Sequence, residues 1–325
     1  MSRVLIIKTS SLGDVVHNLP IVEDILEARP DTVIDWVVEE AYADLPRMHQ
    51  RVNRVIPVAQ RRWRRSRSAQ VAAERGAFEA LLQEEPYDVV LDTQGLLKSA
   101  LLARMARLTP GGERVGFSRR LAREGLARLF YDRGFDVLPH LHAVERLRSL
   151  AAQAMGYAVS GGPRFGLSPP VTRFEWLPEQ PYCVLLHATS RPEKSWPAAE
   201  WQALMAALAA QGLTCVLPHG SDLEYQAALD LARGQPAALV APRLPLAEAA
   251  ALLARACFVV GVDTGLTHLA AALDVPTIAL FGATPRWRYA PYWSARAVSL
   301  GENKRQPRVS EVIGALVGLG VLACA

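Results

Sequence analysis

A strand–turn–helix–strand pattern over residues 258–282 constrains the fold of this chain more than any other stretch. Residues 258–262 are short, apolar and mostly β-branched, as expected of a strand buried on both faces of a sheet. Residues 263–265 break the run, 266–273 have helical composition, and 277–281 form a second buried strand. The polar turn therefore lies where a parallel strand ends and a helix begins, which is where open α/β sheets bind ligands.

This turn has the composition of a phosphate site. The start of a helix offers free N–H groups and a partial positive charge, and Gly265 allows a close approach of the backbone. Asp263, Thr264 and His268 stand beside it. The structural alternative is that Asp263 and Thr264 only cap the helix and that His268 is only a packed helix residue.

The length of 325 residues exceeds what one hydrophobic core usually carries, so two domains are expected. Residues 160–170 hold two clusters of Ser, Gly and Pro and few apolar runs, which places the boundary there. The predicted domains are residues 1–168 and 169–325. The apolar stretch 312–325 is expected to be a packed terminal helix, and packing on the first domain is left open.

Strands alternate with helices in both halves, which predicts α/β domains with parallel sheets. The second half restarts the pattern of the first: an apolar strand, a Thr-Ser turn and a helix. Residues 109–125 are interpreted as a loop because of Pro110-Gly111-Gly112, and one helix is expected from Val15 onward through Pro20. The fold class is therefore α/β, with two Rossmann-like doubly wound domains facing each other across a cleft.

Composition excludes several classes of protein. Half of the residues are hydrophobic and 21% are charged, as in ordinary globular proteins. The N-terminal strand reaches Lys8 after four apolar residues, unlike a signal peptide. No run approaches the roughly 20 apolar residues that span a bilayer. The four cysteines lack metal spacing, and Cys183, Cys215 and Cys257 are interpreted as small buried hydrophobes in a reducing compartment; the fourth is Cys324.

The first polar turn offers a carboxylate. Ser10, Ser11, Gly13 and Asp14 follow the N-terminal strand, so Asp14 lies at a strand-to-helix turn where it could take a proton from a hydroxyl. The alternative is that Asp14 only complements the helix dipole. The turn matches neither the dinucleotide fingerprint nor the Walker pattern.

The second half offers two further polar turns. Thr189, Ser190 and Lys194 combine hydroxyls and a cation near a helix start, which favours phosphate. The turn at 219–224 carries acids suited to ribose hydroxyls, among them Glu224. The second domain is therefore predicted to bind a nucleoside diphosphate.

Arginines concentrate in the first half. Residues 61–67 hold five of them, and Arg114, Arg119, Arg120 and Arg123 form a second group. Such clusters favour an anionic acceptor carrying phosphate or carboxylate, and Trp63 could contact sugar or lipid. A solvated basic face is the alternative.

At these residues the chain resembles the lipopolysaccharide heptosyltransferases of glycosyltransferase family 9. The matching stretches cover nearly the whole chain: 4–17, 35–40, 54–58 with 61–64, 92–99, 142–146, 194–197 and 262–270. Asp-Thr-Gly-Leu-Thr-His marks the broader family, whereas Thr-Ser-Ser-Leu-Gly-Asp and Arg-Arg-Trp-Arg are typical of the heptosyltransferases that add the first heptose rather than the second. Residues 109–120 and the stretch after Gly282 match weakly, which leaves the details of the acceptor open.

The resemblance implies a GT-B fold and an inverting, metal-independent transfer without a cofactor. The donor would be ADP-heptose and the acceptor the inner Kdo of Kdo2-lipid A, in the synthesis of the lipopolysaccharide inner core. The enzyme would then be cytoplasmic and peripheral on the inner membrane of a Gram-negative cell. No nucleic acid is expected as a partner.

The resemblance also implies roles for particular residues. Asp14 would deprotonate the acceptor hydroxyl. The donor site would comprise Thr189, Ser190, Lys194, Glu224, Leu244, Asp263, Thr264, Gly265 and His268, with Leu244 against the adenine. The acceptor site would comprise Ser10, Ser11, Gly13, Arg61, Arg62, Arg64 and Arg123.

Three other functions stay open at this stage. A second heptosyltransferase would use a heptosylated acceptor. A nucleotide-sugar epimerase would share the two-domain layout but need neither lipid acceptor nor basic face. A basic module for nucleic acid or membrane would bind any polyanion in a salt-sensitive way and would not depend on Asp14.

Overall fold

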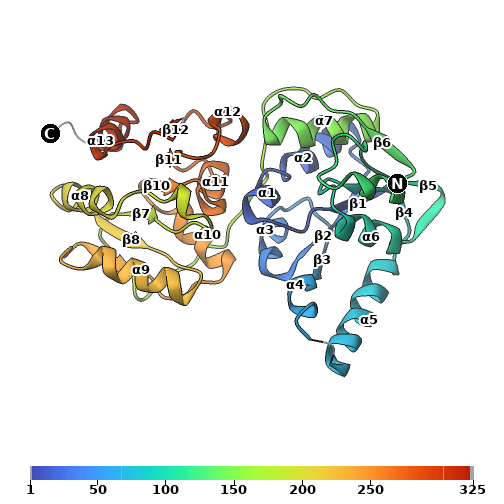
Figure 1. Ribbon diagram of the computed structural model, residues 1–325, viewed down its shortest axis with the longest axis horizontal. Helices are drawn as coiled ribbons and strands as arrows, with labels where there is room; N and C mark the ends of the chain where they lie inside the picture. The colour runs from blue at the N-terminus through green and yellow to red at the C-terminus, as the bar shows by residue number, and fades with distance from the viewer. Residues whose placement is uncertain (1, 67, 303, 323–325) are drawn as a thin grey trace. The chain divides into compact units, whose positions relative to one another are not determined.

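The computed structural model describes residues 2–66, 68–302 and 304–322. The chain divides into two compact units, Met1–Ser168 and Pro169–Ala325. Each unit contains one six-stranded parallel sheet flanked by helices (Figure 1). Within the described ranges, no helix combines the length and the apolar character that a membrane crossing requires.

The first unit has the strand order β3-β2-β1-β4-β5-β6. Its strands are β1 Arg3–Ile7, β2 Val33–Glu39, β3 Arg54–Val58, β4 Tyr87–Asp92, β5 Leu108–Phe117 and β6 Arg133–Phe135. Its α-helices are α1 Leu12–Val16, α2 Pro20–Ala28, α3 Asp44–Arg47, α4 Gln60–Trp63, α5 Ala69–Gln83, α6 Leu97–Met105 and α7 Ala143–Met155. Two 3₁₀ turns, η1 Glu40–Tyr42 and η2 Gly125–Phe130, complete it.

The second unit repeats this layout with the order β12-β11-β10-β7-β8-β9. Its strands are β7 Tyr182–Leu186, β8 Thr214–Leu217, β9 Ala238–Val240, β10 Val259–Val262, β11 Thr277–Leu280 and β12 Ala297–Leu300. Its helices are η3 Pro192–Lys194, α8 Ala198–Ala209, α9 Asp222–Ala232, α10 Leu246–Ala254, α11 Gly265–Ala272, α12 Arg286–Tyr289 and α13 Val309–Gly318.

Both sheets have the strand order of a Rossmann fold. The chain starts in the middle, adds two strands on one side, and returns to the middle to add three on the other. The order therefore reverses between β1 and β4 in the first unit and between β7 and β10 in the second. A crevice opens at such a switch point outside the carboxyl ends of the strands, and ligands bind there.

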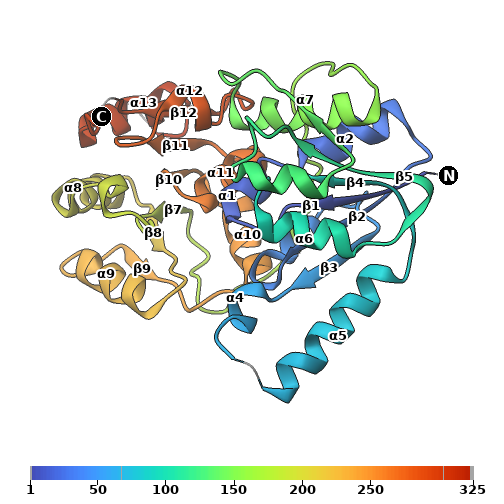
Figure 2. The same ribbon diagram turned by 45° about the vertical axis from the view of Figure 1, so that its right-hand side comes forward.

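The cores explain why the strands read as continuous apolar runs. In β1, Leu5 and Ile7 are fully buried in a cluster that includes Phe78 and Leu82 of α5. Val4 and Ile6 are equally buried, and by the pleat they face the other side of the sheet. Helices α2 and α7 lie side by side (Figures 1 and 2), so this parallel sheet is covered on both faces.

Two expectations about the elements need correction, and a third is confirmed. The helix predicted from Val15 through Pro20 is two helices, because Pro20 lacks an N–H and begins α2 as its first residue. Residues 109–125 are not all loop: β5 runs through Leu108–Phe117, and its pairing with β4 is irregular where the glycines fall. The expected packed terminal helix is confirmed as α13, which packs on the core of the second unit, where Val312 and Leu316 are fully buried.

Candidate active site

At the switch point of the first unit, hydrogen bonds join the loop after β1 to the loop after β4. The amides of Thr9 and Ser10, just after β1, donate to Oε1 of Gln94, just after β4, at 3.2 and 3.3 Å. Lys8 Nζ donates to the carbonyl oxygen of Thr93 at 3.2 Å. All of these side chains are buried. The loop that leads into α1 is therefore held in a fixed place.

Asp14 occupies the first turn of α1, directly after this loop. Its Oδ2 accepts hydrogen bonds from the Ser11 amide at 3.1 Å and the Ser11 hydroxyl at 3.2 Å. The side chain stays 29% exposed, and the Arg123 guanidinium lies 3.9 Å away. Burial raises the pKa of Asp14, but Lys8, the Ser11 amide and Arg123 together hold that pKa below its usual value. The carboxylate is therefore ionised at neutral pH and open on one side.

Cations gather beside this carboxylate. Lys98, in the first turn of α6, donates to the Ser10 hydroxyl at 3.4 Å. Burial lowers the pKa of Lys98, and the charges of Arg61 and Arg64 lower that pKa further, opposed by Glu39. These three cations therefore lie close enough to interact. Together with Arg123 they would attract a substrate with several negative charges. Lys98 was missed as a site residue, because its place beside Ser10 depends on strand order.

Arg62 differs from its neighbours. Its guanidinium binds the carboxylates of Glu40 at 3.0 Å and Glu74 at 2.6 Å. Glu74 also accepts a hydrogen bond from Trp63 Nε1 at 2.9 Å. Arg62 therefore links α4 to η1 and α5, and it would have to leave two carboxylates to meet an acceptor.

Other sequence interpretations in this unit are wrong. Trp63 does not offer its ring to sugar or lipid, since it is buried and packs edge-to-face on Phe78. Arg114 donates to the carbonyl oxygens of Ala103 and Ala106 at the end of α6, so its charge is used within the unit. Arg67, the last arginine of the 61–67 cluster, lies outside the described residues.

The cysteines follow the prediction only in part. Cys183 and Cys215 are buried on neighbouring strands, with their sulfurs 3.8 Å apart. Cys257 is exposed and lies two residues before β10. Cys324 falls beyond the last described residue.

Gln94 is a second residue that sequence reasoning missed, and it gives a direct test of the loop geometry. Gln94→Leu removes the acceptor for two buried amides, so we expect the free energy of unfolding to fall by about 1–3 kcal/mol. Because the loop carries Asp14, we also expect kcat/KM for the transfer that the resemblance implies to fall about 10²-fold. Denaturant titration and steady-state kinetics measure the two effects.

Gln94→Glu is the matched control, because it keeps an oxygen at the position of Oε1. It should recover most of the activity lost in Gln94→Leu. An unchanged stability and rate in the leucine variant would show that the two hydrogen bonds do not position the loop.

The switch point of the second unit holds a triad of Lys194, Asp263 and His268, in which Lys194 is partly buried and the other two residues are buried. Lys194 Nζ donates to Asp263 Oδ2 at 2.7 Å, and His268 Nε2 lies 3.1 Å from Asp263 Oδ1. Lys194 follows β7 and Asp263 follows β10, so the pair bridges the point where the strand order reverses. Burial raises the pKa of Asp263, but His268, Lys194 and Thr284 hold it far below its usual value. The ionised carboxylate thereby fixes the position of the lysine.

The start of α11 lies beside this triad. Thr264 is the N-cap residue, yet its hydroxyl makes no capping hydrogen bond. The interpretation of Thr264 as a capping side chain is therefore wrong. The first amides of α11, beginning at Gly265, have no partner within the helix, as at any helix start. Gly261 lets this helix pack closely on β10, since a Cβ there would overlap the Thr267 hydroxyl.

The remaining predicted donor residues lie on neighbouring loops of the same sheet edge. Thr189 and Ser190 follow β7, and Leu244 lies between β9 and α10. Glu224 is in the first turn of α9, where its Oε2 accepts a hydrogen bond from the Gly220 amide at 2.6 Å. These residues share the carboxyl edge with the triad, but no direct contact joins them to it among the described interactions.

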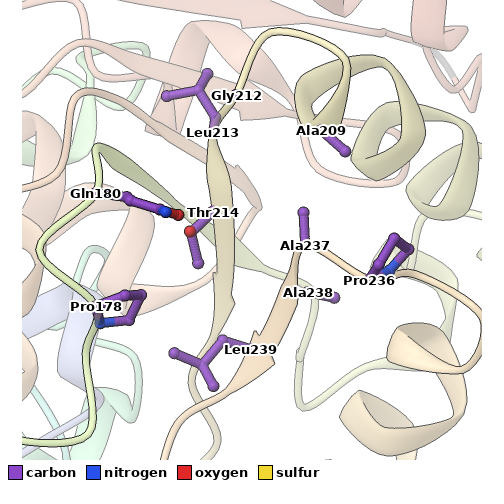
Figure 3. Close-up of a pocket in the computed structure, with 10 residues that line it drawn as sticks. All are labelled: Pro178, Gln180, Ala209, Gly212, Leu213, Thr214, Pro236, Ala237, Ala238 and Leu239. Atoms are coloured by element: carbon purple, nitrogen blue, oxygen red, sulfur yellow. The ribbon is translucent and has the colours of Figure 1, made fainter.

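A cavity of about 480 Å³ opens at the opposite edge of this sheet (Figure 3). Gln180, Gly212 and Pro236 line it, and they precede β7, β8 and β9. None of the predicted donor residues is among its lining residues. No charged side chain is among the lining residues of this cavity.

Two Rossmann units in one chain, each with a polar switch point, are the architecture of the GT-B glycosyltransferases. The sequence profile of glycosyltransferase family 9 (heptosyltransferase) matches residues 75–313, and the chain belongs to this family. The lipopolysaccharide heptosyltransferase 1 of Pseudomonas aeruginosa is 48% identical over 285 residues, which cover 87% of this chain and 79% of that protein.

Solved structures agree with this assignment. The structure of the Escherichia coli heptosyltransferase WaaC with ADP matches with a TM-score of 0.87 at 40% identity, covering 98% of this chain and 99% of that one. The same enzyme with ADP-2-deoxy-2-fluoro heptose matches with a TM-score of 0.83 at 40% identity, over 97% and 99% of the chains. The protein is therefore a glycosyltransferase, as the sequence predicted.

Proposed function

We propose that this enzyme transfers L-glycero-D-manno-heptose from ADP-heptose to the Kdo of Kdo2-lipid A, in the inner core of lipopolysaccharide. The observation that carries the donor assignment is the match to an enzyme solved with ADP and with a fluorinated ADP-heptose. Relatives that are 45–48% identical carry the name lipopolysaccharide heptosyltransferase 1. The basic surroundings of Asp14 suit an acceptor with carboxylates and phosphates.

The second unit would bind the donor. Lys194, the Thr264 hydroxyl and the first amides of α11 would hold the diphosphate, and Asp263 would orient the lysine through their 2.7 Å ion pair. Glu224 would bind the ribose, and Leu244 would contact the adenine. As the sugar C–O bond breaks, the negative charge on the leaving ADP grows, and Lys194 would stabilise that charge without a metal.

The first unit would bind the acceptor and activate it. Asp14 would take the proton from the acceptor hydroxyl while that oxygen bonds to the anomeric carbon of heptose. The acceptor would be surrounded by the predicted acceptor residues of this unit: Ser10, Ser11, Gly13, Arg61, Arg62, Arg64 and Arg123. One carboxylate base and a single displacement give inversion at the anomeric carbon. We place the enzyme at the cytoplasmic face of the inner membrane, because its acceptor is a lipid.

The first test is release of ADP from ADP-heptose, measured with and without Kdo2-lipid A. We expect release only when both substrates are present, together with a heptosylated lipid product. Release with a heptosylated acceptor alone would identify a second heptosyltransferase instead. Release without any acceptor would indicate hydrolysis, and neither result would be compatible with the proposed transfer.

A further inference from the structure

We propose that a basic and apolar ledge beside Asp14 docks the protein on an anionic phospholipid bilayer. The ledge consists of five exposed residues between β5 and β6: Arg119, Arg120, Arg123, Leu126 and Leu129. The inference rests on the proposed function, since a lipid acceptor lies in a bilayer, and it assigns the surface that meets this bilayer.

The two leucines of the ledge are exposed on η2, and buried residues in and just after η2 fix its position. Leu126 and Leu129 are three residues apart in η2, and residues at this spacing eclipse each other in a 3₁₀ helix. They are 55% and 79% exposed. Ala127 between them is fully buried, and Tyr131 just after η2 donates from its hydroxyl to Asp92 at 2.6 Å. The apolar pair is therefore presented to the outside by contacts that keep η2 in place.

Arginines lie close to the leucines in the sequence, at positions 119, 120 and 123. Arg119 lies against the first residue of η2, since a Cβ on Gly125 would come within 3.3 Å of Arg119 Cγ. Within the part of the chain that the structure describes, no carboxylate contacts Arg119 or Arg120, and Arg123 is 3.9 Å from Asp14.

The acids of the same segment accept hydrogen bonds from neutral donors, so they keep their negative charge. Glu124 accepts a hydrogen bond from the Leu97 amide at 2.6 Å, and Asp132 accepts one from the Arg114 amide at 2.7 Å. Asp136 accepts one from the Ser118 hydroxyl. Residues 119–129 nevertheless hold four arginines, including Arg128, against the single acid Glu124, so the net charge of this segment is positive.

The segment that carries the ledge contacts the loops at the switch point of the first unit. The Glu124 amide donates to the carbonyl oxygen of Gly95 at 3.0 Å, next to the Gln94 that holds the Asp14 loop. Arg123 reaches Asp14 itself. A bilayer on the ledge would thus bring the headgroup region to the edge of the unit where the acceptor hydroxyl must arrive.

The chemistry of the ledge selects an anionic bilayer as the occupant. Exposed leucines favour an apolar phase, and arginines close to them in the sequence favour anionic headgroups. A bilayer of zwitterionic lipid satisfies the first requirement but not the second. Binding should therefore depend on both lipid charge and salt.

The experiment measures sedimentation of the full-length enzyme with vesicles that contain no lipopolysaccharide. The vesicles are mixtures of phosphatidylethanolamine and phosphatidylglycerol, compared with pure phosphatidylcholine. The double variant Leu126→Ser/Leu129→Ser should lower the partition coefficient at least about tenfold. The control Leu223→Ser/Leu229→Ser removes two exposed leucines from α9 and should change it less than about twofold.

Transfer to a soluble, delipidated Kdo acceptor separates docking from catalysis. The ledge variant should keep its rate on this acceptor and lose rate on Kdo2-lipid A in vesicles. Equal vesicle binding by the wild type and the ledge variant, or binding by neither, would overturn the proposal. A lost rate on the soluble acceptor would also overturn it, by assigning the leucines to the catalytic cycle. If the wild type binds vesicles but transfers heptose to neither acceptor, the proposed function fails while the docking surface stands.

Discussion

Asp14→Asn is expected to lower kcat/KM for heptosyl transfer by about 10²–10⁴-fold, the range for loss of a general base. The amide keeps the size of the side chain but cannot take the acceptor proton. ADP affinity should change little, because Asp14 belongs to the first unit and the predicted ADP site to the second. The measurements are acceptor-dependent ADP release and calorimetric ADP binding. Asp31→Asn, an exposed aspartate of the same unit, is the matched control.

The pH profile gives an independent check on the same carboxylate. The pKa of Asp14 is below its usual value, so the base is deprotonated above the usual aspartate range and is lost only as pH falls through the lowered pKa. We expect kcat/KM to stay flat from neutral pH down to about pH 5, with an acid limb below the usual pKa of about 3.9. An acid limb near neutral pH, or full activity in Asp14→Asn, would rule out this base.

The strands near the centre of each sheet could be predicted because burial on both faces leaves a plain signal. Residues 4–7 and 258–262 are uninterrupted apolar runs, and both lie within a residue or two of the observed strands. β5 gave no such signal. Its pairing with β4 jumps from Leu108 to Glu113, so Pro110 and the two glycines occupy the irregularity and hide the strand. Strands β6 and β12 were also missed. Both are short and none of their residues is fully buried, so neither forms an uninterrupted buried apolar run.

The sequence predicted the residues of the candidate site within each loop, but not which loops come together. Asp14 and Lys194 stand out because each lies in a turn between a buried strand and a helix. Their partners come from loops far away in the sequence: Gln94 is 84 residues from Ser10, and Asp263 is 69 residues from Lys194. Those pairings require the strand order, because only the switch point brings β1 beside β4 and β7 beside β10.

Isolated charges and aromatic residues were the least predictable. Arg62 and Trp63 appear in one basic cluster, yet one is bound by two carboxylates and the other is buried. Glu74 of α5 explains both, because it accepts hydrogen bonds from the two side chains. No local pattern in the cluster indicates an acid 12 residues from Arg62.

Lys194→Met is expected to lower kcat about 10²–10³-fold at saturating donor, the range for loss of one preorganised charge-stabilising group. Methionine keeps an unbranched side chain of similar length but removes the charge that would meet the departing diphosphate. ADP affinity should fall as well, because the free nucleotide carries the same phosphates. Lys304→Met, at an exposed lysine of the same unit, is the matched control.

Asp263→Asn separates positioning of the lysine from its charge. The asparagine keeps an oxygen near Lys194 but not the ion pair, so Nζ loses the restraint that the 2.7 Å contact provides. We expect an effect on kcat smaller than that of Lys194→Met, and little further loss when the two changes are combined, because both act on one group. Additive losses in the double variant would mean that Asp263 acts on the donor independently of Lys194. If kcat is unchanged in Lys194→Met, Lys194 does not stabilise the leaving group. The amides at the start of α11 would then be the groups that bind the diphosphate.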